Sequence, residues 1–387
     1  MKRIIVLILC VIMLMTTLAS CKSTEKDPIE TPDDTQQSGD TNTPDVTSDD
    51  TPAPGVYDVA FATFPPDTVM IRIEGLNDVT WDEIFVYMRS MVGTLSAYYE
   101  DDPVNWAAPW DDEITCAEWV LQYAKREALY NKALEYGAGL NGVSLTVYDW
   151  ASIDEETYNL MIEWGGEEKY LKMLWEDRGF YSLELFEYLM SFNRLTDLLL
   201  TAIYGKEFEL MTDEEVEGVI ADDGFLMVKH IFIIKPEEDD GGDTYERIED
   251  ILAELNAYSG DDFISYFDEL MRTYSEDNEG LDKLPDGYLF LYGDLTQYFY
   301  DAAMSLEVNE LSGVVEGEDG YHIIYRIPIN YDAVPFSFAV QEDFRSLRAL
   351  VASSKFSVLH EGWMNMLEPE FTDELESIDI SEMFKRA

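Results

Sequence analysis

The chain has 387 residues, of which 25 are Lys or Arg and 80 are Asp or Glu, so its formal net charge at pH 7 is −55. A chain this acidic repels phosphate groups, and its composition therefore argues against a nucleic-acid partner. The hydrophobic fraction of 47% is enough to build folded cores, and the length corresponds to about two or three domains.

The N-terminal residues have the features of a secretory signal. A basic start at Lys2 precedes an apolar run at 4–18, which is short for a membrane span and has no stop-transfer charges after it. The segment LASC at 18–21 resembles the lipobox of bacterial lipoproteins, which implies cleavage before Cys21 and acylation of its thiol. We therefore expect residues 1–20 to be a signal peptide and the protein to be lipid-anchored on the extracytoplasmic face of a bacterial cell membrane. An ordinary signal peptide followed by a chance cysteine is the alternative.

The next segment, 21–55, is polar and acidic, with no aromatic residue and few aliphatic ones. It cannot bury enough apolar surface to offset the entropy of ordering, so we expect a disordered tether between the membrane and the folded part. After cleavage, Cys116 is the one cysteine left besides the acylated one, and we expect no intramolecular disulfide.

Residues 56–222 are predicted to form an all-α lobe. After a short strand-like stretch (TVMIRI), capping boxes of the form S/T-x-x-E predict helix starts at Thr80, Thr115, Ser152 and Thr212. The lobe is rich in aromatic and methionine side chains, which form either its core or an adaptable surface for unfolded chains. We favour the core for most of them, although helical spacing alone does not distinguish a groove from an interior.

The pattern changes to strands and helices in alternation at 223–330. FLMVKHIFII is predicted to be a strand, TYERIEDILAELNAYSG and DDFISYFDELMRTYSED are amphipathic helices, and DGYHIIYRI closes the unit as a strand. A short strand and a third helix are expected in DGYLFLYGDLTQYFYDAAMSL. The first and last strands of this region contain His230 and His322. We expect these two strands to be neighbours at the centre of a small antiparallel sheet. A histidine buried in a strand needs either a hydrogen-bond partner or a role in a site.

In combination, these motifs resemble the parvulin-type (PpiC, rotamase) peptidyl-prolyl isomerases over the whole of this region. The specific pieces are VKHIFI in the first strand, YSED after the second helix, LEVNELSGVV, and DGYHIIYRI at the end. The helical region, the lipobox and a C-terminal helix expected at about 336–367 resemble the layout of PrsA-type foldase lipoproteins and SurA-type chaperones. The implied fold class is α+β, with a parvulin domain at 223–330 inserted into a helical lobe that residues 331–387 complete.

The resemblance places the parvulin histidine pair at His230 and His322, which the fold holds close together on adjacent strands beneath the substrate groove. Asp277, in YSED, falls where the family carries Cys or Asp facing the substrate peptide. Two interpretations of the histidines stay open, a hydrogen-bonded structural pair and direct participation in the reaction. Two histidines and an aspartate could also ligate zinc, but no fourth ligand is apparent, and we expect no metal or other cofactor.

The family's proline pocket falls on Leu295 and Phe299, and Phe232 and Tyr321 are expected to contact the substrate as well. The sequence also departs from the family. LPDGYL replaces the glycine-rich GGDLG of many members, and Gly317 stands at one of the Thr or Ser positions before Gly-Tyr-His. The second departure removes a hydroxyl from the family's histidine hydrogen-bond network.

The leading hypothesis is a membrane-tethered peptidyl-prolyl cis-trans isomerase and foldase that acts on unfolded or newly exported proteins with X-Pro bonds. One alternative is a parvulin-like chaperone that only binds its clients. Another is the solute-binding lipoprotein of a transporter, which requires two α/β lobes. Phosphoserine-proline substrates are disfavoured because acidic EEDD follows the first strand. A homodimer through the apolar helical lobe is a further hypothesis.

Overall fold

The computed structural model describes three stretches of the chain, 56–99, 104–236 and 242–384. The contacts within the chain divide it into two units, of which one is 200–357 and the other combines the residues on both sides of that range. The predicted insertion of a sheet-containing domain into a lobe built from both sides of the chain is therefore confirmed. The predicted domain limits of 223–330 stay a prediction. The predicted signal peptide, Cys21 and the linker lie outside the described residues.

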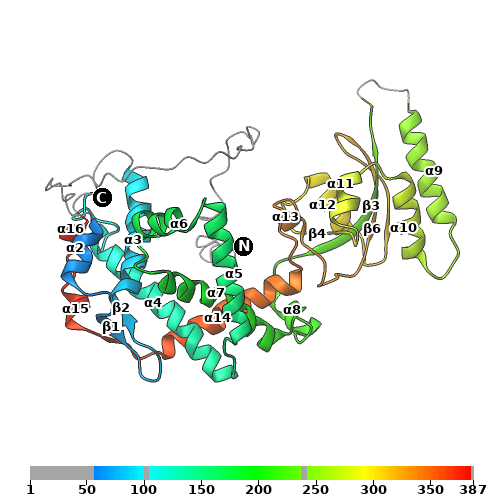
Figure 1. The fold of residues 1–387 in the computed structure, drawn as a ribbon. Helices are drawn as coiled ribbons and strands as arrows, with labels where there is room; N and C mark the ends of the chain where they lie inside the picture. Colours follow the sequence, from blue (N-terminus) through cyan, green and yellow to red (C-terminus); the bar gives the residue numbers. More distant parts are fainter. Residues whose placement is uncertain (1–55, 100–103, 237–241, 385–387) are drawn as a thin grey trace, which may run out of the picture. The chain divides into compact units, whose positions relative to one another are not determined.

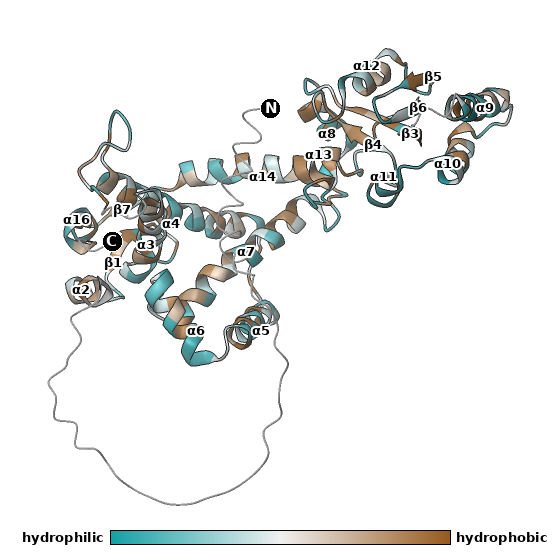
Figure 2. Ribbon diagram, turned by 90° about the horizontal axis from the view of Figure 1, so that it is seen from above, coloured by the Kyte–Doolittle hydropathy of each residue, from teal (hydrophilic) through white to brown (hydrophobic). Residues whose placement is uncertain are grey.

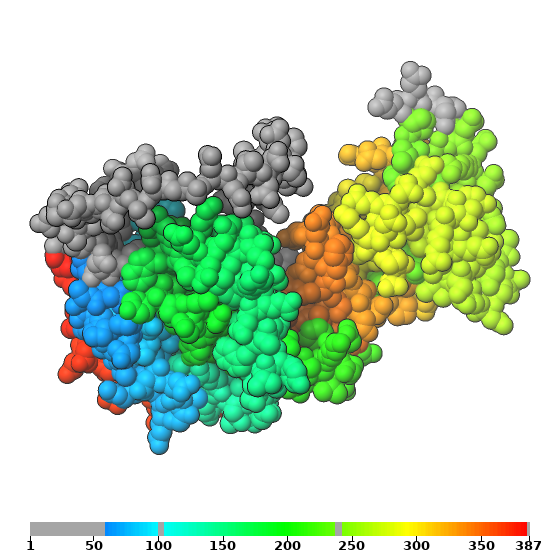
Figure 3. Space-filling view, viewed as in Figure 1, coloured from blue at the N-terminus to red at the C-terminus, as the bar shows by residue number. Residues whose placement is uncertain are grey.

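The first unit, made of described residues up to 199 and from 358 onward, is mainly helical (Figure 1). Its helical elements are α2 (Val56–Thr63), α3 (Trp81–Tyr99), α4 (Cys116–Asn141), α5 (Val147–Glu163), α6 (Glu167–Met173), the π-helix η1 (Leu174–Arg178), most of α7 (Leu183–Tyr204), the end of α14 (Leu347–Met366), α15 (Asp373–Glu376) and α16 (Ile380–Met383). The last helix packs on the first, and red residues lie beside blue ones in Figure 3.

A small sheet accompanies these helices. Strands β1 (Val69–Arg72), β2 (Val79–Thr80) and β7 (Glu370–Phe371) pair antiparallel in the order β2-β1-β7. The strand β1 falls in the stretch TVMIRI that had a strand-like sequence. The lobe predicted to be all-α therefore also contains a sheet, which joins its N-terminal part to its C-terminal part.

Capping boxes start several of the helices, as predicted, but not all of those that the sequence indicated. The boxes at Thr115 and Thr212 are present. The box predicted at Ser152 is wrong, because α5 begins five residues earlier and is capped by Thr146, whose partner is Asp149 in place of a glutamate. An aspartate fits this role as a glutamate does, since the carboxylate of either residue can accept the backbone N–H of the capping residue.

A buried polar network joins α3, α4 and α7 inside the helical unit. Lys132 has no exposed surface, and its ammonium donates to Tyr188 Oη at 2.7 Å and to Glu135 Oε1 at 3.1 Å. Glu83 is 2% exposed and accepts from Tyr87 Oη at 3.3 Å. Burial raises the pKa of Glu83 to about 7, against the opposing attraction of the Lys132 charge. The single positive charge of Lys132 can balance only one of the two nearby carboxylates, Glu83 and Glu135. Its ammonium donates a hydrogen bond to Glu135.

The aromatic and methionine side chains of this unit are less buried than we expected. The prediction concerned Tyr98, Tyr99, Trp106, Trp110, Trp119, Tyr123, Met161, Trp164, Met173 and Trp175. Of these ten residues, Met173 belongs to the core, Tyr98, Trp110 and Trp164 are exposed, and the other six are half-buried. The interpretation of most of them as core residues is therefore wrong. Helical spacing places such side chains on one face of a helix, but it does not say whether a second element covers that face.

The second unit contains a four-stranded antiparallel sheet in the order β4-β3-β6-β5. Its elements in chain order are α8 (Asp213–Ile220), β3 (Leu226–Ile234), α9 (Asp243–Ala257), α10 (Phe263–Tyr274), α11 (Asn278–Lys283), β4 (Tyr288–Phe290), α12 (Gln297–Ser305), β5 (Leu311–Glu316), β6 (Gly320–Arg326) and α13 (Phe336–Ala339). The two histidine-bearing strands, β3 and β6, are central neighbours, so the predicted fold class and strand pairing are confirmed. Helix α11 and strand β5 were not predicted.

The two faces of this sheet have different coverings, because successive side chains along a strand point to opposite faces. On one face Lys229 of β3 forms an ion pair of 2.8 Å with Asp268 of α10, and α9 packs on β6. On the other face Phe299 of α12 packs with Ile324 of β6 in a buried cluster. Figure 1 shows α9 and α10 on one side of the sheet and α12 on the other, and the strands are mainly brown in Figure 2.

The predicted C-terminal helix at 336–367 is divided in the structure. Helix α13 ends at Ala339 and α14 begins at Leu347. Glu342 lies between them with a φ of 61°, which is a left-handed conformation that no continuous α-helix accommodates. The prediction of one helix missed this break, because Val340, Phe344 and Leu347 recur at helical spacing across it.

Candidate active site

The two buried histidines of the sheet lie in contact at its centre. Phe232 on β3 pairs with His322 on β6, and His230 pairs with Ile324, so the histidines stand diagonally on the same face. Their Nδ1 atoms are 3.3 Å apart, and each side chain belongs to a residue only 7% exposed. Each buried histidine thus has a hydrogen-bond partner, which is the ring of the other histidine.

Asp277 extends this contact on the side of His230. Its Oδ2 lies 3.0 Å from His230 Nε2, and the hydroxyl of Tyr288 donates to the same oxygen. Its Oδ1 accepts the Gly280 N–H at 3.1 Å, because Asp277 is the N-cap of α11. One carboxylate therefore caps a helix and contacts the histidine pair at once.

The segment before α11 is bound along the edge of β3, and this fixes where Asp277 stands. Glu276 donates its N–H to the carbonyl of Phe232 at 2.8 Å, and the Phe232 N–H donates to Ser275 Oγ at 3.1 Å. The Ile234 N–H donates to the Glu276 carboxylate at 2.8 Å. The YSED motif thus acts as a short extension of the sheet.

The electrostatics of the site favour an ionised Asp277 carboxylate and a neutral His322 ring. Burial tends to raise the pKa of Asp277, but hydrogen bonds from His230 and Tyr288 outweigh it and lower that pKa to about 2. Burial, reinforced by the neighbouring His230, lowers the pKa of His322 to about 3. At neutral pH the site thus contains a negative charge on Asp277 and an uncharged His322.

An apolar wall adjoins these polar groups. The ring of Phe299, which is 4% exposed, has its centroid 5.2 Å from that of His230 and 5.3 Å from that of His322. Phe232 stacks on His322 with centroids 4.5 Å apart, and half-buried Leu295 packs against the cluster that contains Phe299. The predicted residues His230, Asp277, His322, Phe299 and Phe232 therefore lie together on this face of the sheet, and Leu295 lies against the adjoining cluster.

Tyr321 is not brought to that place. Its ring contacts Tyr245 of α9 at a centroid distance of 5.3 Å, and the ammonium of Lys235 lies 4.6 Å from its centroid. The residue neighbours His322 in β6, and neighbours in a strand point to opposite faces of the sheet. Its side chain therefore lies on the face covered by α9.

Two residues of the site were missed in the sequence. Tyr288 contacts Asp277 and lies edge-on to His230 with ring centroids 4.8 Å apart, and the hydroxyl of Tyr298 lies 3.5 Å from His322 Nε2. Tyr288 is the tyrosine of LPDGYL, the segment where the sequence departs from the family pattern. Tyr298 directly precedes Phe299. Their hydroxyl positions follow from the packing of β4 and α12, which no local pattern indicates.

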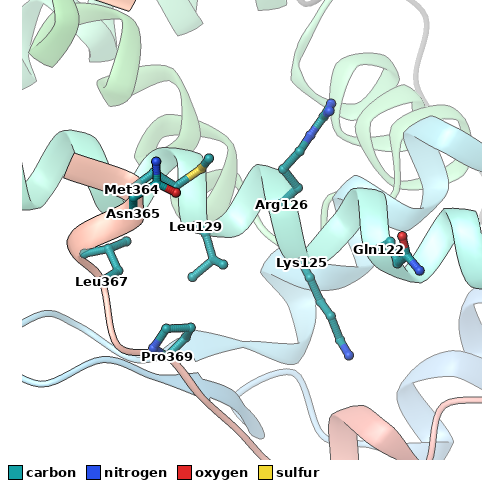
Figure 4. A pocket seen from close by; sticks show the side chains of 8 residues that line it. All are labelled: Gln122, Lys125, Arg126, Leu129, Met364, Asn365, Leu367 and Pro369. Carbon is teal, nitrogen blue, oxygen red and sulfur yellow. The ribbon is translucent and has the colours of Figure 1, made fainter. Parts of the chain in front are cut away.

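Elsewhere, the helical unit contains a hollow of about 430 Å³ between α4 and the end of α14 (Figure 4). It is lined by Gln122, Lys125, Arg126, Leu129, Met364, Asn365, Leu367 and Pro369. Both cations are engaged, Lys125 with Glu376 at 2.6 Å and Arg126 with Glu127 at 3.2 Å. Within the described residues, no three His, Cys, Asp or Glu side chains form a metal-binding group. The helices of that same part of the chain include none long and apolar enough to cross a membrane.

Residues 230–327 match the rotamase family model, the PPIC-type PPIASE domain. The matched range begins at His230 and contains Asp277, Phe299 and His322. The resemblance of this region to the parvulin-type isomerases is thereby confirmed.

Two relatives match parts of the chain. A foldase protein PrsA of Halalkalibacterium halodurans is 31% identical over 116 residues, which are 30% of this chain and 31% of that protein. A putative peptidyl-prolyl cis-trans isomerase, dodo, of Drosophila melanogaster is 45% identical over 60 residues, 16% of this chain and 36% of that protein. The chain thus spans about a third of the length of each of these relatives.

Solved structures of PrsA proteins also match. The one from Bacillus subtilis has 16% identity and a TM-score of 0.26, over 83% of this chain and 100% of that chain. The one from Bacillus anthracis has 17% identity and a TM-score of 0.23, over 62% of this chain and 94% of that chain. TM-scores of this size support no argument about how the parts of this chain are arranged.

Proposed function

We propose that this protein is a peptidyl-prolyl cis-trans isomerase whose active site lies on the α12 face of the four-stranded sheet. The observation that carries the proposal is the charged carboxylate of Asp277 in contact with the histidine pair, next to the buried ring of Phe299. The match of residues 230–327 to the isomerase family model supports it.

The reaction makes modest chemical demands. Rotation about an X-Pro bond meets a barrier of about 18–20 kcal/mol and takes tens to hundreds of seconds unaided, because resonance gives the C–N bond partial double-bond character. The rotation breaks no covalent bond, so it requires neither a nucleophile nor a cofactor. It is accelerated by a surface that fits the twisted amide better than the planar one. Each tenfold gain in rate requires about 1.4 kcal/mol of such preference.

The residues of the site supply that preference in two ways. Phe299, Leu295 and Phe232 form an apolar wall on which a proline ring packs, and they exclude the water that stabilises the polarised planar amide. The planar amide places more negative charge on its carbonyl oxygen than the twisted amide does. The negative charge of Asp277 near that oxygen therefore disfavours the planar ground state. The histidine pair holds the carboxylate in position.

We also propose that the protein works outside the cytoplasm on a lipid anchor, as a foldase for unfolded or newly exported proteins with X-Pro bonds. The support is the sequence itself, with LASC at 18–21 and the acidic linker after it. The relative from Halalkalibacterium halodurans is named a foldase. A homodimer through the helical unit stays a hypothesis.

Proline-limited refolding of an unfolded protein tests the isomerase proposal. We expect the chain without its lipid to accelerate the slow phase, and the Asp277→Ala and Phe299→Leu variants to lose most of that acceleration. Asp301→Ala is the matched control, because Asp301 is an exposed carboxylate on the same helix as Phe299. A folded wild type that leaves the slow phase unchanged but suppresses aggregation would contradict the proposal and favour a chaperone that only binds its clients.

A further inference from the structure

Two tyrosine hydroxyls end the row of polar groups that passes through the histidine pair. At one end the hydroxyl of Tyr288 donates to Asp277 Oδ2. At the other end the hydroxyl of Tyr298 lies 3.5 Å from His322 Nε2, the longest contact of the row. Between them the row continues through the Nδ1 contact of His322 with His230, and from His230 Nε2 to Asp277. Side chains from β3, β4, β6, α12 and the N-cap of α11 thus form one continuous chain of contacts.

The chemistry of these groups decides which atom donates the hydrogen in each contact of the row. An ionised carboxylate only accepts hydrogen bonds, so His230 Nε2 carries the hydrogen in its contact with Asp277. A neutral imidazole has one donor and one acceptor, so at pH values where both rings are neutral His230 Nδ1 accepts from His322 Nδ1–H. His322 Nε2 is then left as an acceptor, and the hydroxyl of Tyr298 is its donor. Every hydrogen bond of the row therefore points toward Asp277.

The backbone leaves room for both tyrosines. A Cβ at Gly317 would overlap the hydroxyl and ring of Tyr298, and a Cβ at Gly280 would overlap the hydroxyl of Tyr288 and the carboxylate of Asp277. Glycine at these two positions is therefore a condition for each hydroxyl to reach its partner. Two glycines that are distant in the sequence thus leave space for the tyrosine side chains at the two ends of the row.

We propose that Tyr288 and Tyr298 are positioning residues of the isomerase site, which donate the hydrogen bonds at the two ends of the row and so hold the histidine rings and the Asp277 carboxylate toward the substrate amide. This inference rests on the proposed function for its catalytic consequence. Its structural part does not depend on activity. Tyr298 acts only through His322, since its hydroxyl donates to Nε2, the ring nitrogen that does not contact His230.

Nitrogen NMR of the histidine rings tests the direction of the row. The chain has only three histidines, so ¹⁵N-histidine labelling gives few signals. His360 is an internal reference, because its Nε2 lies 2.8 Å from the Tyr130 carbonyl oxygen, which can only accept. At about pH 8 we expect hydrogen on His322 Nδ1 and on His230 Nε2.

The Tyr298→Phe variant should keep the hydrogen on His322 Nδ1, because His230 Nδ1 still accepts it. The resonance of His322 Nε2 should shift, because this acceptor nitrogen loses its donor, while the His360 signals stay unchanged. Supplying a hydroxyl from the neighbouring backbone with Tyr298→Leu and Gly317→Ser together should reverse that shift. A wild-type His322 with hydrogen on Nε2, or an unchanged His322 Nε2 resonance in Tyr298→Phe, would overturn the inference.

The catalytic consequence is measured in the same variants. We expect kcat/KM to fall about tenfold in Tyr288→Phe and about threefold in Tyr298→Phe, since a hydrogen bond to a charged group contributes more than one between neutral groups. Tyr300→Phe, which removes a tyrosine hydroxyl from the same helix outside the row, is the control and should keep its activity. Unchanged kcat/KM in both site variants would overturn the positioning role. An inactive wild type would refute the proposed function, and the tautomers would still decide the hydrogen-bond direction.

Discussion

Acidification should weaken the sheet unit through His322, well before any carboxylate of the site is protonated. The pKa of this ring is lowered by burial and by His230 from 6.5 to about 3. Below pH 6.5 the unfolded chain binds a proton at this residue and the folded chain does not. The stability that the neutral ring contributes is therefore complete above pH 6.5 and is lost as the pH falls toward about 3.

The expected size follows from the same values. At pH 5, protonation of the His322 ring, whose pKa in the unfolded chain is 6.5, stabilises the unfolded state by about 2 kcal/mol. Each pH unit below that pKa contributes about 1.36 kcal/mol. His322 is only 7% exposed, so solvent screening reduces this little. The equilibrium constant for opening of the sheet unit should thus be about thirty times larger at pH 5 than at pH 7.5.

Amide hydrogen exchange in β3 and β6 measures this effect, after correction for the intrinsic pH dependence of exchange. His322→Gln should have a flatter pH profile in the same strands. Tryptophan fluorescence during denaturation reports the other unit separately, because all eight tryptophans lie before residue 200 or after residue 357. Equal protection of β3 and β6 at both pH values, or an equal loss in His322→Gln, would refute the reasoning.

Three further predictions concern other parts of the chain. The raised pKa of Glu83 means that the folded helical unit holds a proton that the unfolded chain releases. The free energy of unfolding, followed by tryptophan fluorescence, should therefore fall by about 1 kcal/mol from pH 6 to pH 8. The Glu83→Gln variant should abolish this fall. Thr146→Ala should cost the helical unit about 1 kcal/mol in chemical denaturation and Ser152→Ala almost nothing, because only Thr146 caps α5; equal costs would contradict this assignment. Gly280→Ala should displace the Tyr288 hydroxyl and reduce isomerisation more than Gly139→Ala reduces it, and a fully active Gly280→Ala would argue against the tight contact.

Much of the sheet unit could be predicted because its strands and helices carry strong local patterns. The runs of apolar and β-branched residues in FLMVKHIFII and DGYHIIYRI predict two strands, and the resemblance to a family supplied His230, Asp277 and His322 together. The structure adds why these three meet. The strand register places the histidines diagonally, and the segment before α11 is bound along the edge of β3.

The parts that the sequence did not reveal depend on contacts between distant segments. Tyr288 and Tyr298 look like ordinary aromatic residues of a strand and a helix, and their hydroxyl partners lie on other elements. Tyr321 shows the opposite error, because it is a neighbour of His322 in the chain and yet belongs to the other face. The true cap of α5 was missed because its box ends in an aspartate.

The central claim is that the α12 face of the sheet catalyses rotation about X-Pro bonds. Exchange NMR of a short X-Pro peptide measures that rotation directly, without a coupled protease or a folding reaction. The account predicts that catalytic amounts of the chain cause cis-trans exchange cross-peaks that are absent for the peptide alone, and that Asp277→Asn, which removes the charge but keeps the shape, greatly weakens them. A folded chain that leaves the peptide's exchange rate unchanged, or an Asp277→Asn variant as active as wild type, would contradict it.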